Sequence, residues 1–258
     1  MPEWFVVGAA GLFGLAIGSF LNVCIIRLPA DESLVHPPSR CPTCGTPIPW
    51  YDNVPVASWI ALRGKCRSCR TRISIQYPVV EAATAALWMS AAWYYGFTVT
   101  GVGAALFGSI LLGITVTDAQ HMIIPHEFTF GGLVIGLGMA AIQGWAQVVQ
   151  AALGAVSGFA LIWSVGTLGT WAFKKEAMGG GDVWMMTMVG AFVGWSGVLL
   201  TVLFGAFLGT IVYGPIALLQ RRQGMLLPFG VFLAPAAAAT FVVGDAVWAW
   251  YVGVLGLH

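Results

Sequence analysis

Charged side chains are scarce in this chain of 258 residues, of which only 8% are Asp, Glu, Lys or Arg. A soluble domain carries about 25%. Hydrophobic residues make up 59% of the chain instead, and they gather in long runs. This shortage of charge excludes an ordinary soluble protein and predicts an all-α membrane protein with the lipid bilayer as a partner. The net charge of +1 says nothing of other partners, and we expect no nucleic-acid partner.

A cleaved signal peptide is not predicted. The first four residues contain Glu3 and no positive charge, and the apolar run that follows them is too long for the hydrophobic region of such a signal. The 12 Trp and 34 Gly residues suit membrane helices, where Trp is common at the interfaces and Gly at helix contacts.

About eight segments have the composition of a membrane-spanning helix, which needs roughly 20 mostly apolar residues. Their ends are set to within a few residues, and they cover 5–26, 79–96, 101–117, 128–143, 147–172, 183–194, 197–219 and 229–254. The sixth is short, so it either tilts or begins earlier. The sequence thus predicts a first transmembrane helix at 1–26, a polar domain at 27–78 and a seven-helix transmembrane domain at 79–258.

The basic residues predict how these segments are oriented. All eleven Lys and Arg residues lie in three connections: seven in 27–78, two at Lys174 and Lys175, and two at Arg221 and Arg222. With eight spans the three connections share one side of the membrane, which the positive-inside rule assigns to the cytoplasm. We therefore expect a multi-pass protein with both termini on the periplasmic or extracellular side.

Cysteine is also rare, yet four of the five cysteines form two CxxC pairs. The pairs, Cys41–Cys44 and Cys66–Cys69, are separated by 21 residues, a spacing typical of one tetrahedral Zn²⁺ site. Four thiolates predict a closed, structural site with no open position for catalysis. Two disulfides or four reduced thiols are the alternatives, although disulfides are rare in the cytoplasm. The segment 27–78 is therefore predicted to be a small zinc-binding cytoplasmic domain.

Two aspartates lie at the ends of apolar segments, both on the expected cytoplasmic side. Asp118 follows the third segment, and Asp182 follows Gly179-Gly-Gly181 before the sixth. We expect Gly179 and Gly181 to let the backbone turn and approach a ligand closely. Two carboxylates that share one site and one proton can activate water and protonate a leaving amine, which together hydrolyse a peptide bond.

Helix capping is the simpler interpretation of these two acids. It suits Asp182, which precedes a helix, because a helix N-terminus favours negative charge. It does not suit Asp118, which lies at a helix C-terminal end where the dipole disfavours negative charge. A proton-coupled transporter is a further alternative, but such proteins more often have internal repeats and acids near the middle of the membrane.

Several motifs together give the chain a resemblance, nearly from end to end, to type IV prepilin peptidases, the bifunctional leader peptidases and N-methyltransferases of pilus and type II secretion systems. The motifs are Gly18-Ser-Phe-Leu-Asn-Val, Tyr51-Asp-Asn-Val-Pro-Val-Ala-Ser58, Gly64-Lys-Cys-Arg-Ser-Cys69, Tyr77-Pro-Val-Val-Glu81, Asp118 with Pro125, Gly179-Gly-Gly-Asp182 and Pro228-Phe-Gly-Val-Phe-Leu-Ala234.

The resemblance implies an intramembrane aspartyl peptidase of the bacterial inner membrane, with Asp118 and Asp182 as the catalytic pair. Its substrate would be a prepilin or pseudopilin, cut on the cytoplasmic side just before the apolar helix of that substrate. It would then methylate the new N-terminal residue with S-adenosylmethionine, whose site no glycine-rich motif locates. A peptidase alone, with a purely structural zinc loop, remains the alternative.

Four positions depart from the pattern common in that family. Trp184 lies where the family often has Lys, and Val231 where it often has Pro. Gln120 and His126 lie where many members have an acid.

Overall fold

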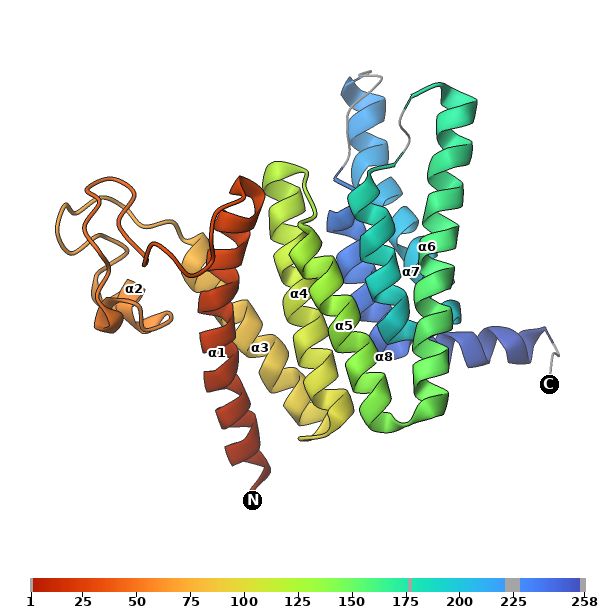
Figure 1. Ribbon diagram of the computed structural model, residues 1–258, viewed down its shortest axis with the longest axis horizontal. Coiled ribbons are helices and arrows are strands. Elements are labelled where there is room, and N and C mark those ends of the chain that lie inside the picture. Colours follow the sequence, from red (N-terminus) through yellow and green to blue (C-terminus); the bar gives the residue numbers. More distant parts are fainter. Residues whose placement is uncertain (1, 176–177, 221–227, 256–258) are drawn as a thin grey trace. The chain divides into compact units, whose positions relative to one another are not determined.

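The computed structural model describes residues 2–175, 178–220 and 228–255, and its long elements are all helices (Figure 1). Within these ranges the chain has isolated β-bridges but no β-strand. The predicted all-α class is therefore confirmed. Arg221 and Arg222, which contributed to the predicted orientation, lie outside the described residues.

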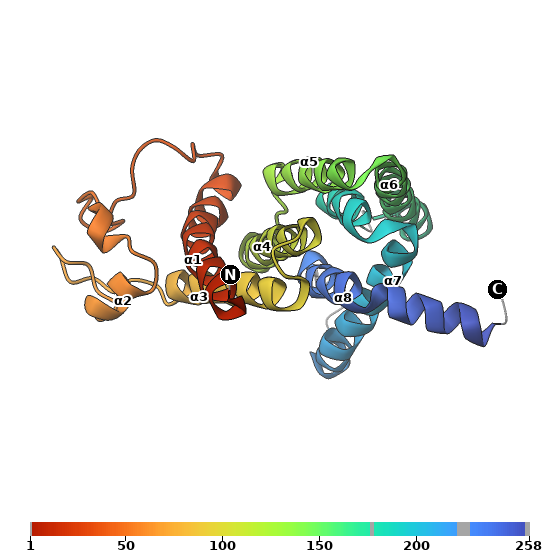
Figure 2. The same ribbon diagram turned by 90° about the horizontal axis from the view of Figure 1, so that it is seen from below.

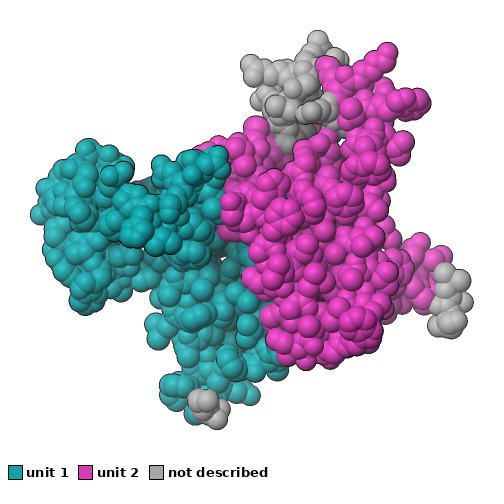
Figure 3. Space-filling model, viewed as in Figure 1, with its two compact units in different colours: residues 1–113 teal, residues 114–258 magenta. Residues whose placement is uncertain are grey.

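The chain divides into two compact units, residues 1–113 and 114–258 (Figure 3). The first unit contains α1 (Glu3–Arg27), η1 (Leu28–Ala30), η2 (Trp50–Asp52), α2 (Ala57–Ala61), α3 (Gln76–Tyr95) and the first part of α4 (Val99–His121). The second unit contains the end of α4, then α5 (His126–Gln143), α6 (Trp145–Phe173), α7 (Gly180–Gln220) and α8 (Gly230–Val254).

In the described part of the chain, five helices are long and apolar enough to cross a membrane: α1, α4, α6, α7 and α8. This agrees with the expected multi-pass membrane protein. The shorter helices α3 and α5, of 20 and 18 residues, are not among the five. The predicted number of eight spans is therefore not confirmed.

Helix α7 joins the two segments that the sequence predicts as the sixth and seventh spans. Its 41 residues would extend about 60 Å as one straight helix, about twice the thickness of the hydrocarbon core. The helix is interrupted at Gly194, where φ is 69° and ψ is 178°, a backbone conformation that favours glycine. In Figure 1 the half before Gly194 descends and the half after it rises. The break lies beside the predicted boundary at 195–196.

In the first unit, α1 packs closely against α3 because its contact face carries glycines. A Cβ atom added to Gly14 would lie 2.8 Å from the Cα atom of Ala85, and one added to Gly18 would lie 2.6 Å from the Cα atom of Glu81. Real Cβ atoms do not approach so closely, so both positions require glycine. Small residues of this kind let membrane helices pack backbone to backbone.

In the second unit, α5, α6 and the first half of α7 lie side by side (Figure 2). Gly154 of α6 and Gly190 of α7 are in such close contact that a Cβ atom on either would overlap the backbone of the other. A Cβ atom on Gly158 of α6 would overlap the carbonyl oxygen of Met186 in the same way. These contacts fix the first half of α7, which begins with the residues around Asp182.

The contact between α1 and α3 generates a stability prediction. We expect Gly18→Ala to destabilise the protein by about 1–3 kcal/mol, the usual cost of overpacking, and to lower its melting temperature in detergent. Gly8→Ala is the matched control on the same helix, because a Cβ atom there meets no atom within 4 Å. Equal melting temperatures for the two variants would contradict this account of the contact.

Candidate active site and metal centre

Asp118 lies in the last turn of α4 and is buried, with 5% of its surface exposed. Its Oδ2 atom accepts a hydrogen bond from the backbone N–H of Val231 at 3.1 Å, and the N–H of Gly230 lies beside the same carboxylate. Gly230 and Val231 are the first two residues of α8, whose N-terminus carries free N–H groups and partial positive charge. The N-terminus of α8 therefore offsets the unfavourable position of Asp118 at the C-terminal end of α4.

Asp182 is partly buried in the first turn of α7, where a negative charge is favoured. Its backbone N–H donates to the carbonyl oxygen of Gly179 at 3.2 Å. Its carboxylate lies near enough to Asp118 for their charges to interact. The second unit thus brings together the two aspartates that the sequence singles out, and each carboxylate lies at the N-terminal end of a helix.

Ile124 is the side chain against which the starts of α7 and α8 both pack. It lies between α4 and α5 and is 8% exposed. A Cβ atom on Gly181 would lie 3.0 Å from the Cβ atom of Ile124, and one on Gly230 would lie 3.0 Å from its Cδ1 atom and 2.8 Å from Oδ2 of Asp118. Both positions are therefore too close to their neighbours for a larger residue. Sequence reasoning did not find this role for Ile124, because its contacts are distant in the chain.

The backbone before Asp182 turns without the positive φ angles that favour glycine. None of Gly179, Gly180 and Gly181 adopts a positive φ angle. A Cβ atom on Gly179 would lie 3.4 Å from Oδ2 of Asp182, whereas one on Gly180 would meet nothing within 4 Å. Gly179 and Gly180 are exposed. The backbone just before the aspartate is therefore open to approach on one side and closely packed on the other.

Trp184, one of the four positions that depart from the expected pattern, belongs to an aromatic cluster from three helices. Its ring centroid is 4.7 Å from that of Phe130 in α5 and 5.7 Å from that of Phe159 in α6. Phe130 also lies beside His126, with 5.6 Å between ring centroids. These separations are typical of favourable aromatic pairs. No spacing in the sequence predicts the cluster, because its members come from separate helices.

The four CxxC cysteines of the first unit form one cluster, as predicted. Their sulfur atoms all lie within 4.8 Å of one another, and those of Cys41 and Cys69 are 3.8 Å apart. None of the cysteines is in a disulfide. Zn–S bonds of 2.3 Å in a tetrahedron would hold the sulfurs about 3.8 Å apart. The donor set therefore fits one tetrahedral metal ion, held by Cys41, Cys44, Cys66 and Cys69.

The two halves of the cluster repeat one backbone turn. The N–H of Cys41 donates to the carbonyl oxygen of Thr46 at 2.9 Å, and the N–H of Cys66 donates to that of Thr71 at 2.8 Å. In each half the residue after the second cysteine has a positive φ, 70° in the first and 59° in the second. Each CxxC pair thus forms a tight turn with both sulfurs directed to one point.

The clustered cysteines differ in how readily they ionise. Hydrogen bonds with the side chain and backbone of Thr46 lower the pKa of Cys44 to about 6, and the thiolate is the form that binds metals. The pKa of Cys69 is raised to about 11, because desolvation and the other three cysteines outweigh a backbone hydrogen bond with Thr71 that lowers it. A metal ion at the centre would offset this crowding of sulfurs.

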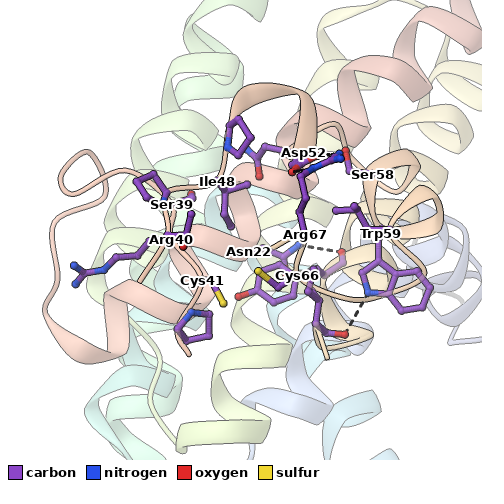
Figure 4. A pocket seen from close by; sticks show the side chains of 18 of the residues that line it. Asn22, Ser39, Arg40, Cys41, Ile48, Asp52, Ser58, Trp59, Cys66 and Arg67 are labelled. Carbon is purple, nitrogen blue, oxygen red and sulfur yellow. Dashed lines mark hydrogen bonds and ion pairs between the residues drawn. The ribbon is translucent and has the colours of Figure 1, made fainter. Parts of the chain in front are cut away.

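A cavity of about 1020 Å³ opens between the cysteine loop and the adjoining ends of α1 and α3, entirely within the first unit (Figure 4). Cys41 and Cys66 line it, so it adjoins the four-cysteine cluster. Asp52 and Arg67, which also line it, form an ion pair at 2.6 Å. The hydrogen bonds from Arg67 hold the pKa of the Asp52 carboxyl below its usual value.

Two family models match consecutive parts of the chain. Residues 12–95 match the bacterial peptidase A24 N-terminal domain, which covers the cysteine loop and its flanking helices. Residues 105–214 match the type IV leader peptidase family, which covers both aspartates. No solved structure significantly matches the chain.

Curated relatives named prepilin leader peptidase/N-methyltransferase match at greater length. The protein of Aeromonas hydrophila is 35% identical over 96% of this chain and 94% of its own length, and that of Pseudomonas aeruginosa PAO1 is 36% identical over 95% and 93%. The Myxococcus xanthus relative is 39% identical over 83% of this chain, which spans 64% of that protein. Because these matches extend over nearly the whole sequence, this chain belongs to the type IV leader peptidase family.

Proposed function

We propose that the protein cleaves the leader peptide of type IV prepilins or pseudopilins with Asp118 and Asp182, and then methylates the new N-terminal residue. The observation that supports the proposal best is the convergence of the two carboxylates at the starts of α7 and α8, packed around Ile124. The names of the relatives supply the substrate class and the second activity. S-adenosylmethionine would be the methyl donor.

The proposed peptidase chemistry needs one aspartate with a proton and one without. Two like charges in contact are difficult to ionise together, so a close pair tends to share one proton. The ionised carboxylate takes a proton from water as the oxygen of that water attacks the scissile carbonyl carbon. The protonated carboxyl group donates a hydrogen bond to the carbonyl oxygen, and the leaving amine receives a proton as the C–N bond breaks.

The N-termini of α7 and α8 contribute to this chemistry because they position the two aspartates. The N–H of Val231 holds one oxygen of Asp118, which fixes the carboxylate relative to Asp182 and stabilises its ionised form. The exposed backbone at Gly179 and Gly180 leaves room for an extended substrate segment beside Asp182. Substrate would therefore approach from the side of the glycines, as their motif suggests.

We further infer eight membrane crossings in the bacterial inner membrane. In this interpretation α3 and α5 each cross once, and α7 crosses twice with its break at Gly194. The segment 27–78 and the two lysines at 174 and 175 then lie in the cytoplasm, and both termini lie on the opposite side. The cut would be made at the cytoplasmic face, since both aspartates lie at that end of their helices. Residues 27–78 would form the zinc domain and 79–258 the peptidase domain.

The aspartate pair is tested by Asp118→Asn and Asp182→Asn. Each should reduce leader cleavage by about 10²-fold to 10⁴-fold, because loss of a positioned acid or base has that effect. Cleavage of a purified prepilin can be followed by the change in its mass. Asp245→Asn is the matched control, since this exposed aspartate of α8 has no part in the proposed chemistry. Normal cleavage by either of the first two variants would refute the mechanism.

The contact between Gly230 and Asp118 generates a second prediction. Gly230→Ala would force the carboxylate or the start of α8 to move, and a displacement of about 1 Å at an active site can cost about 10²-fold in rate. We expect slower leader cleavage with the protein still inserted. Gly253→Ala, in the same helix with no atom within 4 Å of the added Cβ, should cleave normally. Wild-type cleavage by Gly230→Ala would show that this contact does not position the pair.

The metal is proposed to be Zn²⁺ with a structural role. Metal analysis of the purified protein should find about one zinc ion per chain. Cys66→Ser should lose the metal, whereas Cys24→Ala should keep it because Cys24 lies in α1 away from the cluster. A zinc-free preparation that remains folded would contradict the structural role.

A further inference from the structure

Two facing helical turns form the floor of the cavity in the first unit. On α1 the turn runs from Gly18 to Asn22, and on α3 it runs from Tyr77 to Glu81. Gly18 lies against the backbone of Glu81, and the Asn22 amide donates to the carbonyl oxygen of Tyr77. Asn22 and Glu81 therefore line the cavity together, where its two helical walls meet. The volume of about 1020 Å³ is that of a small-molecule site.

Asn22 contributes a buried hydrogen-bond acceptor that has no donor. The residue is 2% exposed, and its Nδ2 atom donates to the carbonyl oxygens of Tyr77 at 3.0 Å and Gly18 at 3.3 Å. Those two carbonyls fix the orientation of the amide, because only its NH₂ group can donate to them. The Oδ1 atom is left buried without a partner. An unsatisfied buried acceptor is costly, and because Asn22 lines the cavity, we infer that a ligand in the cavity supplies the donor.

Glu81 adds a buried carboxylate, 6% exposed. It accepts hydrogen bonds from the N–H of Val56 at 2.7 Å and from the hydroxyl of Ser19, which leaves part of its capacity for about four hydrogen bonds unused. Across the described residues the ion pair found is that of Arg67 with Asp52, so no cationic side chain there pairs with Glu81. An ionised carboxylate is costly to bury without a cationic partner, so a cation supplied from the cavity would stabilise the charged form of Glu81.

The two observations point to one kind of ligand. An amide oxygen and a carboxylate offer only acceptors, and the group that complements them is a positively charged donor with several hydrogens. A primary ammonium has three N–H donors and no acceptor. Beside Glu81 itself a phosphate or carboxylate would meet a like charge, although four arginines line other parts of the same cavity.

We propose that Asn22 and Glu81 form a binding site for a primary ammonium group at the floor of this cavity. The inference rests on the methyl transfer proposed above, since both reactants of that step carry such a group. One is the amino-acid end of the methyl donor, and the other is the newly exposed N-terminus of the substrate. Asn22 and Glu81 would bind the same chemical group, a primary ammonium, in both cases.

The test is a binding experiment with two pairs of probes, and in each pair only one member carries the ammonium group. S-adenosylhomocysteine carries an amino-acid end with an ammonium and a carboxylate, and 5′-methylthioadenosine lacks both, so the Glu81→Gln variant separates the contribution of the ammonium from that of the carboxylate. A peptide with a free N-terminal Phe carries the other ammonium, and its N-acetylated form does not. Calorimetry on the full chain in detergent gives the dissociation constant of each probe. In at least one pair, the amine-bearing probe should bind the wild-type protein with a dissociation constant about ten-fold lower, or lower still, than that of its amine-free counterpart.

Glu81→Gln keeps the shape of the side chain and removes the charge. It should weaken binding of the preferred amine-bearing probe about ten-fold or more, and leave its amine-free counterpart unchanged. Glu32→Gln is the matched control, because it removes an exposed carboxylate from the rim of the same cavity and should alter neither. Zinc content and melting temperature of each variant report whether it folds.

Each outcome decides the proposal. A loss confined to S-adenosylhomocysteine assigns the site to the methyl donor, and a loss confined to the free-amine peptide assigns it to the methyl acceptor. Wild type that binds both members of each pair equally overturns the proposal without any variant, as does equal weakening of both members by Glu81→Gln.

Failure of the proposed methyl transfer would give a different set of results from failure of the ammonium site. Wild type that binds an amine-bearing probe selectively but adds no methyl group to a processed prepilin would refute the methyl transfer and leave the ammonium site standing. Wild type that methylates the prepilin without this selectivity would refute only the ammonium site.

Discussion

The hydrogen bond from the start of α8 to the Asp118 carboxylate is the interaction on which the second unit depends. Without it a buried acid would remain at the C-terminal end of α4, where the helix dipole opposes its charge. The bond requires α8 to begin directly against α4, and this in turn requires glycine at position 230. Ile124 packs against that glycine and also against Gly181, so the same contact fixes the start of α7 and the position of Asp182.

A comparable dependence links the parts of the first unit. The glycines of α1 bring its backbone against α3, and this close packing places Asn22 and Glu81 on one cavity floor. The N–H of Val56 then joins the loop beside the metal cluster to Glu81. A metal held by the four cysteines would order that loop, because a segment of this size has little hydrophobic core of its own. The four-cysteine cluster, the loop and the cavity floor are therefore one connected structure.

Some features could be predicted from the sequence because their causes are local. Apolar runs predict the helices, and the CxxC spacing predicts the four-cysteine cluster, which the structure confirms. The joining of the sixth and seventh segments in α7 was not predicted, because a single glycine at position 194 replaces the polar connection that usually marks the end of a helix. Trp184 is also explained only by Phe130 and Phe159, which come from other helices. The catalytic role of Asp118 and Asp182 stays a prediction.

The sequence by itself determined which residue types are present and what lies within a few turns of each: the apolar helices, the two cysteine turns, and an acid at the end of one helix and the start of another. Only the tertiary structure decided which distant groups meet. Val231 follows Asp118 by 113 residues, and nothing in their local patterns relates them. Asn22 and Tyr77 are 55 residues apart. Such contacts arise when helices pack, because close packing depends on the shapes of both faces at once and no single segment carries that information.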